Sequence, residues 1–195
     1  MYGIYAPGVQ SLNPGFGMGW SDAGVIIPWT DWLQQGDVQV AEQNWDAMNR
    51  YMGAIANANP DFLWKNEIGI PFGDWLAPGG RAAVDLVATA YWAYDTELMR
   101  QLAHALKKEE EEKKYADLHA KIKQAFIKAY TRRDGYVGGG NLAPSPFAST
   151  VDKESDRTLA ETQTGYVLAL YMNLVPEKCA KVGGRQTCRD DREKR

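Results

Sequence analysis

The chain has 195 residues, a length that permits one domain or a piece of a larger one. Its 45% hydrophobic and 24% charged residues are typical of a globular protein, and no stretch of about 20 consecutive apolar residues predicts a membrane span. The formal charge is only −3, and basic and acidic residues are mixed along 107–128, so the sequence predicts neither a membrane protein nor a nucleic-acid-binding protein.

The first two predicted helices occupy residues 22–35 and 38–59. In the second, apolar residues recur at three- and four-residue spacing, which is the pattern of an amphipathic helix, and Pro60 ends it. Pro28 lies within the first helix. Because proline lacks a backbone donor and clashes with the preceding turn, it either kinks this helix or marks its first turn.

The next two helices, over residues 84–106 and 115–130, are predicted to pack as an antiparallel hairpin, because each carries an apolar stripe at helical spacing. The charged residues 107–114 lead into the second of these helices, and the charge run 109–114 is interpreted as a solvated turn or helix start. The stripe residues are Tyr91, Tyr94, Leu98, Leu102 and Leu106 in the first helix, and Tyr115, Leu118, Ile122, Phe126 and Tyr130 in the second.

A fifth helix is predicted over residues 158–174, ending before Pro176. The sequence shows little sustained strand alternation, so the predicted fold class is all-α. Two long connections, 60–83 and 131–157, separate the helices and are rich in Gly, Pro, Ser and Asp. Connections of this length in compact domains are often functional.

The end of the chain differs from the rest, because residues 178–195 are charged and poor in large hydrophobic residues. We therefore expect one helical domain over 1–177 and a disordered or artificial polar tail over 178–195. The two cysteines, Cys179 and Cys188, lie in this tail and are interpreted as incidental thiols. His104 and His119 have no third partner at ligand spacing, so no metal site and no cofactor are predicted. The first residues show no secretory signal pattern, and the sequence does not indicate a compartment.

Aromatic residues are plentiful, and several of the 7 tryptophans and 10 tyrosines stand beside Gly, Asp and Pro instead of in helical stripes. The apolar face of a pyranose packs on aromatic rings while its hydroxyl groups bind carboxylates, so this placement indicates a carbohydrate site. The alternative, in which the rings only seal the core, stays open.

Four motifs, in the same order along the chain, resemble those of the α-L-rhamnosidases, a family of inverting glycoside hydrolases. Residues 19–29 (Gly-Trp-Ser-Asp-Ala-Gly-Val-Ile-Ile-Pro-Trp) resemble the family's Trp-Gly-Asp-Ala motif, with Ser21 in place of glycine. Residues 72–76 (Phe-Gly-Asp-Trp-Leu) resemble its second aromatic loop. Residues 88–91 (Ala-Thr-Ala-Tyr) resemble the start of the helix that follows, and 162–170 (Thr-Gln-Thr-Gly-Tyr-Val-Leu-Ala-Leu) a later inner helix.

The resemblance covers most of residues 20–176 and implies an (α/α)6 barrel, in which six helical hairpins surround a funnel and loops at one end hold the sugar. A complete barrel needs twelve helices, so five predicted helices make roughly half of one. Residues 1–177 would then be part of a helical glycosidase catalytic domain. The remaining half of the barrel, or self-association, would have to cover an exposed apolar face.

The same resemblance implies substrate-binding roles for four residues, Trp20, Asp22, Asp74 and Trp75. The two rings would stack on the apolar side and methyl group of a deoxy-sugar, and the two carboxylates would accept hydrogen bonds from its hydroxyl groups. We expect both pairs to converge on one concave surface, because the two loops should open at the same end of the helical array. On spacing alone, Asp22 could equally cap a helix and Asp74 could support a turn.

The catalytic pair is not among the matched motifs. Inverting glycosidases use a general acid and a general base about 6.5–9.5 Å apart. The resemblance implies that the acid lies in an Arg-Asp-Glu motif upstream of the first motif and that the base lies downstream of the last one. Among the carboxylates present, Asp31 and Asp95 fit exposed helix positions and Glu161 fits the first turn of a helix. Glu67, in the long connection before Asp74, is the catalytic candidate that remains.

The leading interpretation is a segment of a glycoside hydrolase that removes terminal α-L-rhamnose with inversion from a rhamnose-containing glycoside or oligosaccharide. Its acid and base would lie outside this chain, which would be inactive on its own. The alternatives are a non-catalytic sugar-binding helical module and a purely structural helical scaffold. Titration with rhamnose beside an assay on an aryl rhamnoside distinguishes the three.

Overall fold

A computed structural model describes residues 17–68, 74, 81–132, 136–140 and 162–175. These ranges contain five helices: α1 Ala23–Gln35, α2 Gln39–Ala58, α3 Val84–Ala105, α4 Glu109–Tyr130 and α5 Gln163–Tyr171. Within the same ranges, extended pairing is limited to an isolated bridge between Thr131 and Val137. The all-α prediction is confirmed.

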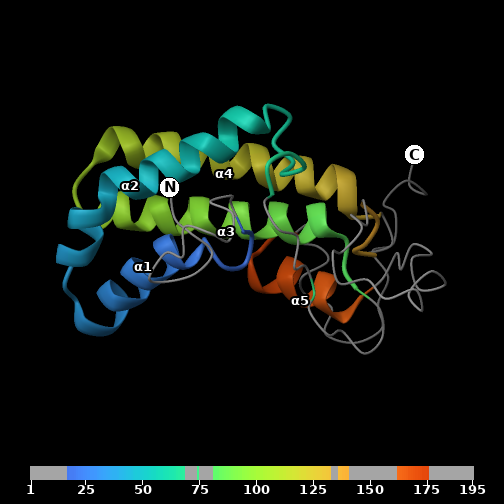
Figure 1. Cartoon of the computed structure of the whole chain (residues 1–195), viewed down its shortest axis with the longest axis horizontal. Coiled ribbons are helices and arrows are strands. Elements are labelled where there is room, and N and C mark those ends of the chain that lie inside the picture. The colour runs from blue at the N-terminus through green and yellow to red at the C-terminus, as the bar shows by residue number, and fades with distance from the viewer. Residues whose placement is uncertain (1–16, 69–73, 75–80, 133–135, 141–161, 176–195) are drawn as a thin grey trace, which may run out of the picture.

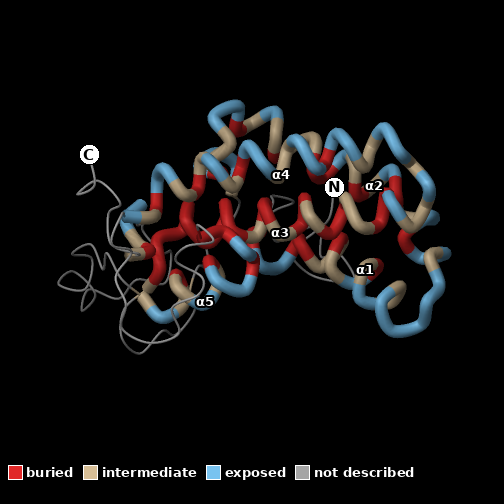
Figure 2. The backbone as a smooth tube through the Cα atoms, turned by 180° about the vertical axis from the view of Figure 1, so that it is seen from behind, coloured by how far each residue is buried: buried red, intermediate tan, exposed pale blue. Residues whose placement is uncertain are grey.

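Helix α3 lies in the middle of the array, with α4 along one side and α1 and α5 along the other (Figure 1). Its sequence explains this position, because alanine, threonine and large apolar residues occupy nearly every face, and 15 of its 22 residues are buried. A helix that is apolar all round is stable only when neighbours cover it on several sides. In Figure 2, the buried residues accordingly follow the path of α3.

The predicted hairpin is confirmed, since α3 and α4 run antiparallel and side by side with a short turn between them (Figure 1). Helix α4 begins at Glu109, within the charged run, rather than near Tyr115. The four glutamates of its first turn explain this early start, because negative side chains are favoured at the positive end of a helix dipole. The charged residues are therefore a helix start.

Two details of α1 and α5 follow from single residues. Pro28 lies in the second turn of α1, so the alternative in which it marks the first turn is wrong. Gly36, whose φ is 71°, ends α1 in the left-handed conformation that glycine adopts most readily. Helix α5 begins after Thr162, whose hydroxyl oxygen accepts a hydrogen bond from the Gly165 amide at 3.0 Å. The prediction of one helix over 158–174 is wrong at both ends among the described residues, because Thr162 is extended and the helix ends at Tyr171. Residues 158–161 lie outside the described residues.

Large apolar side chains remain exposed on the two helices that lie opposite α4. They are Ile27 and Leu33 on α1, and Val167, Leu170 and Tyr171 on α5. Scattered exposed apolar residues need no explanation, but several on neighbouring helices indicate a surface that another element covers. None of the five described helices is long and apolar enough to cross a membrane.

Candidate functional site

Trp20 lies at the tip of a tight turn that leads into α1. We name residues 17–22 the Trp20 turn. Within it, the Gly17 carbonyl accepts hydrogen bonds from the amides of Trp20 at 3.0 Å and Ser21 at 2.7 Å. The Ser21 hydroxyl oxygen accepts one from the Gly17 amide at 3.1 Å. Gly19 has a φ of 79°, a conformation that an L side chain rarely adopts. The Trp20 side chain is left 50% exposed.

Asp22 holds this turn against α2 from inside the molecule. Its side chain is completely buried and accepts hydrogen bonds from the Tyr51 hydroxyl at 2.9 Å and from the Gly19 amide. Although Asp22 occupies the position before α1, its side chain makes no capping hydrogen bond, so the alternative in which it caps a helix is wrong. Burial raises the pKa of Asp22 above its usual range, and the contact with Asp95 and the hydrogen bonds from Tyr51 and Gly19 only partly offset this rise.

Asp95 is completely buried in the middle of α3, so the prediction that it occupies an exposed helix position is wrong. At helical spacing Asp95 lies on the apolar stripe, four residues after Tyr91 and three before Leu98, and Asp22 of the Trp20 turn lies next to it. Neither oxygen of Asp95 has an N–H or O–H hydrogen-bond partner among the described residues. Burial first, and then the neighbouring Asp22, raise the pKa of Asp95 well above its usual range. Asp31, the other residue predicted to be exposed, is partly exposed on α1.

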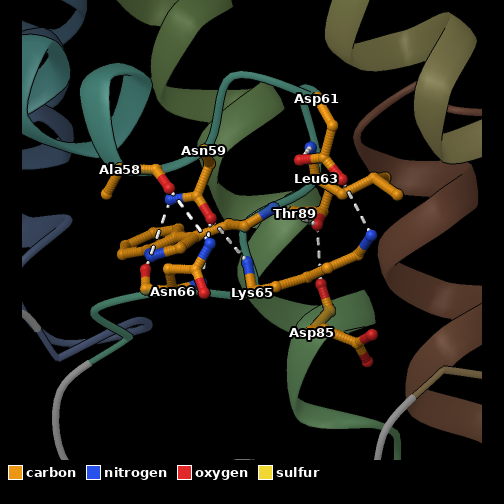
Figure 3. Close-up of polar contacts among 9 residues, drawn as sticks. Ala58, Asn59, Asp61, Leu63, Lys65, Asn66, Asp85 and Thr89 are labelled. Atoms are coloured by element: carbon orange, nitrogen blue, oxygen red, sulfur yellow. Dashed lines mark hydrogen bonds and ion pairs between the residues drawn. The ribbon is translucent and has the colours of Figure 1, made fainter.

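The connection after α2 is organised around Asn59, as Figure 3 shows. This buried side chain accepts hydrogen bonds through Oδ1 from the amides of Lys65 at 2.8 Å and Asn66 at 2.9 Å. Its Nδ2 donates to the carbonyls of Ile55 at 3.0 Å and Asn66 at 3.2 Å. We name these contacts the Asn59 network. They tie residues 65–66 to the end of α2, and sequence reasoning missed them, although Asn-Pro is a known turn signal.

A second contact fastens this connection to α3. The Trp64 amide donates to the Thr89 hydroxyl oxygen at 2.9 Å, and the Thr89 hydroxyl donates to the Asp85 carbonyl at 2.7 Å (Figure 3). Trp64 is completely buried. The described beginning of the 60–83 connection is therefore a fixed part of the fold.

Glu67 follows the Asn59 network and its side chain is exposed. Its φ is 54°, which is uncommon for a residue with a side chain and costs free energy that other contacts of the fold must offset. Strained backbone often occurs at functional sites, but exposure gives Glu67 no apolar surroundings of the kind that tune a catalytic acid. Glu161 lies outside the described residues.

Asp74 joins two of the motifs that are far apart in the sequence. Its Oδ2 accepts a hydrogen bond from the Thr164 hydroxyl at 2.7 Å, across 90 residues of chain. Thr164 lies in the first turn of α5, next to Gly165, which the Thr162 hydroxyl caps. The second aromatic loop and the Thr-Gln-Thr-Gly motif therefore meet at one end of α5. Trp75 lies outside the described residues.

Asp22 and Asp74 lie on the same side of α3 but at different positions along it. Asp22 is beside Asp95, whereas Asp74 is bonded to the start of α5, where Gly165 packs near Leu86. Nine residues of α3 separate Leu86 from Asp95, which corresponds to roughly 14 Å along the helix axis. The convergence of the two aromatic loops on one concave surface stays a prediction.

The two histidines lie away from these residues. His104 is exposed, and its Nδ1 is 3.0 Å from a carboxylate oxygen of Glu112 at the turn between α3 and α4. His119 on α4 is half-buried, and burial lowers its pKa. In the part of the chain that the structure describes, no three His, Cys, Asp or Glu side chains are grouped so as to hold a metal ion. Cys179 and Cys188 fall outside that part.

Comparison with known proteins gives one consistent result. The family model of the bacterial alpha-L-rhamnosidase 6 hairpin glycosidase domain matches residues 1–194. An α-L-rhamnosidase of Streptomyces avermitilis is 33% identical over 176 residues, which are 90% of this chain and 14% of that protein. An α-L-rhamnosidase of Formosa agariphila is 29% identical over 167 residues, which are 82% of this chain and 16% of that protein. The chain thus spans about one sixth of the length of these relatives.

A solved structure gives the same answer for the fold. The crystal structure of Streptomyces avermitilis α-L-rhamnosidase complexed with L-rhamnose is similar to this chain with a TM-score of 0.72 and 31% sequence identity. The match covers 90% of this chain and 14% of that one. The predicted division at residue 177 stays a prediction, because residues 176–195 lie outside the described ranges.

Proposed function

The chain belongs to the bacterial α-L-rhamnosidase six-hairpin glycosidase family, and we propose that it is a segment of a glycoside hydrolase that removes terminal α-L-rhamnose with inversion. Its helices are part of an (α/α)6 barrel. The hydrogen bond between Asp74 and Thr164 is the observation that carries the proposal. It connects an aromatic loop to the start of an inner helix, which is where loops of a helical barrel can form a sugar site.

The proposed substrate is a rhamnose-containing glycoside or oligosaccharide. Trp20, half-exposed at the tip of its turn, and Trp75, which follows Asp74 in the sequence, offer ring faces to the apolar side and methyl group of the sugar. Asp74 offers a carboxylate oxygen to its hydroxyl groups. The complete burial of Asp22 favours an indirect role, in which Asp22 fixes the Trp20 turn.

The proposed general acid and base lie outside this chain. Inversion requires two carboxyl groups on opposite faces of the sugar with room for a water between the base and the anomeric carbon. Asp22 and Asp95 are buried against each other, which leaves no such room between them, and Glu67 is exposed. The segment would therefore contribute binding energy and orientation, and the rest of the barrel would contribute the chemistry.

We further propose that the apolar side chains exposed on α1 and α5 are covered by the remaining helices of the barrel. Ile27, Leu33, Val167, Leu170 and Tyr171 form this uncovered surface. In the isolated chain, a second copy would be the available cover, so sedimentation should show self-association that increases with concentration. A monomer at every concentration would contradict this part of the proposal.

Removing a stacking ring should weaken substrate use without unfolding the protein. In a complete enzyme that contains this segment, Trp75→Ala and Trp20→Ala should each lower kcat/KM for an aryl α-L-rhamnoside about 5- to 150-fold, equivalent to about 1–3 kcal/mol for one aromatic stacking contact. Steady-state kinetics and the melting temperature are measured on the same samples. Val40→Ala, which truncates an exposed side chain on α2 outside the surface formed by α1 and α5, is the matched control and should change neither quantity.

A structural role for the rings gives the reverse pattern. The melting temperature would fall strongly, while kcat/KM of the folded fraction would equal that of the unchanged enzyme. That outcome would remove the tested tryptophan from the sugar site. A non-catalytic sugar-binding module would show rhamnose binding that depends on these rings, with no turnover even when the complete protein is assayed.

A further inference from the structure

Two aspartates meet inside the molecule where solvent cannot reach them. Asp22 ends the Trp20 turn, and Asp95 lies in the middle of α3, 73 positions further along the chain. Both side chains are completely buried, and their carboxyl groups are close enough to interact directly. Two ionised carboxylates in contact in a region of low dielectric constant repel each other strongly. If one of them keeps its proton, that repulsion is replaced by a hydrogen bond.

The hydrogen bonds around the pair indicate which member keeps the proton. Asp22 accepts from the Tyr51 hydroxyl at 2.9 Å and from the Gly19 amide, as an ionised carboxylate does. Neither oxygen of Asp95 receives a hydrogen bond from another N–H or O–H donor among the described residues. An ionised Asp95 would be a buried charge without a donor, whereas a protonated Asp95 can donate to Asp22.

Among the described residues, the titratable groups that interact with the pair are tyrosines, not cations that would draw the proton from Asp95. They are Tyr51 from α2 and Tyr91 and Tyr94 from α3, and Tyr171 of α5 packs on Tyr94. Burial raises the pKa of Tyr91, so this phenol stays neutral near pH 7. A neutral phenol does not stabilise a second negative charge as a cation would, so a shared proton is the remaining way to relieve the repulsion within the pair.

We propose that Asp95 is a positioning residue that keeps its proton near neutral pH and donates it to Asp22. Three donors, from Asp95, Tyr51 and Gly19, then hold the Asp22 carboxylate, and the Gly19 contact fixes the turn that carries Trp20. The shared proton does not depend on the proposed rhamnosidase function. Only the use of the fixed turn for sugar binding rests on that function.

The test is the pH dependence of unfolding of the full chain with the variants Asp95→Asn and Asp95→Leu. A carboxyl group whose folded pKa is raised contributes stability that is present at low pH and is lost as pH rises through that pKa. The unchanged chain should therefore lose stability relative to Asp95→Asn as pH rises above the ordinary aspartate range of about 4. The amide of Asp95→Asn donates to Asp22 at every pH and removes this dependence. Asp46→Asn, at an exposed position of α2, is the control and should leave the pH profile unchanged.

Amide hydrogen exchange of Gly19 tests the positioning role separately. Its N–H donates to Asp22, so exchange should be slow in the unchanged chain and in Asp95→Asn, and faster in Asp95→Leu, which lacks a donor. Infrared spectroscopy at pH 7 should show the band of a protonated carboxyl group in the unchanged chain and no such band in Asp95→Asn. This comparison does not need the leucine variant, so the test stays decisive if Asp95→Leu fails to fold.

A pH profile and infrared spectrum that are the same for the unchanged chain and Asp95→Asn would overturn the proposal that the two aspartates share a proton. Equal Gly19 exchange in a folded Asp95→Leu would overturn the positioning role, and either failure leaves the proposed function standing.

Discussion

Asn59→Ala is expected to lower the free energy of unfolding by about 2–4 kcal/mol, because it removes four hydrogen bonds from a buried side chain, and each contributes about 0.5–1.5 kcal/mol net. The alanine also leaves the Ile55 carbonyl and the two amides of residues 65–66 without the partner that the fold provides. Denaturant unfolding of the full chain, followed by circular dichroism, measures the change.

The loop itself supplies a matched control. Asn66 keeps its backbone contacts to Asn59 when its side chain is replaced, and that exposed side chain makes one contact, from Nδ2 to the Ala58 carbonyl at 3.0 Å. Asn66→Ala should therefore cost about 1 kcal/mol or less. Asn59→Asp keeps the two acceptor contacts but loses both donors and buries a charge, so it should be as harmful as the alanine. Equal effects of Asn59→Ala and Asn66→Ala would show that the network does not stabilise the fold.

The helices could be predicted from the sequence because their apolar residues repeat at helical spacing. The predicted 38–59 and 84–106 agree with α2 and α3 within one residue at each end. The stripe indicates the most apolar face, but it does not indicate whether the other faces are covered. α3 also buries Ala90 and Ala93, which lie off the stripe, and their burial depends on neighbours far away in the chain. Asp95 is different, because it follows Tyr91 by four residues and precedes Leu98 by three, so the stripe itself predicts a buried position.

The site could be predicted only in part for the same reason. The motifs identified Trp20, Asp22 and Asp74 as candidates, but the partners of these residues come from other elements. Tyr51 lies 29 residues from Asp22, and Thr164 lies 90 residues from Asp74. No local pattern encodes such pairs, and whether a carboxylate is buried or open to a sugar depends on them. The Asn59 network depends likewise on the path of residues 60–66, which no periodicity specifies.

The complete absence of turnover by the isolated chain is the largest effect expected on activity. A single missing catalytic carboxyl group removes most of the rate enhancement of a glycosidase, and here both are proposed to lie elsewhere in the barrel. The sugar-binding loops alone cannot protonate a leaving group or activate a water. Of the carboxylates discussed above, Asp22 and Asp95 are buried against each other, Asp74 is engaged with Thr164, and Glu67 is exposed.

Incubating the purified, folded chain with an aryl α-L-rhamnoside and following release of the aryl alcohol tests the central claim most directly. The claim that this is a binding segment of a six-hairpin rhamnosidase, with its acid and base outside, predicts release at the rate of buffer alone for both the chain and Glu67→Gln. Release above that rate would contradict the claim. If Glu67→Gln abolished it, Glu67 would be a catalytic residue, and if it did not, another carboxylate of this chain would be.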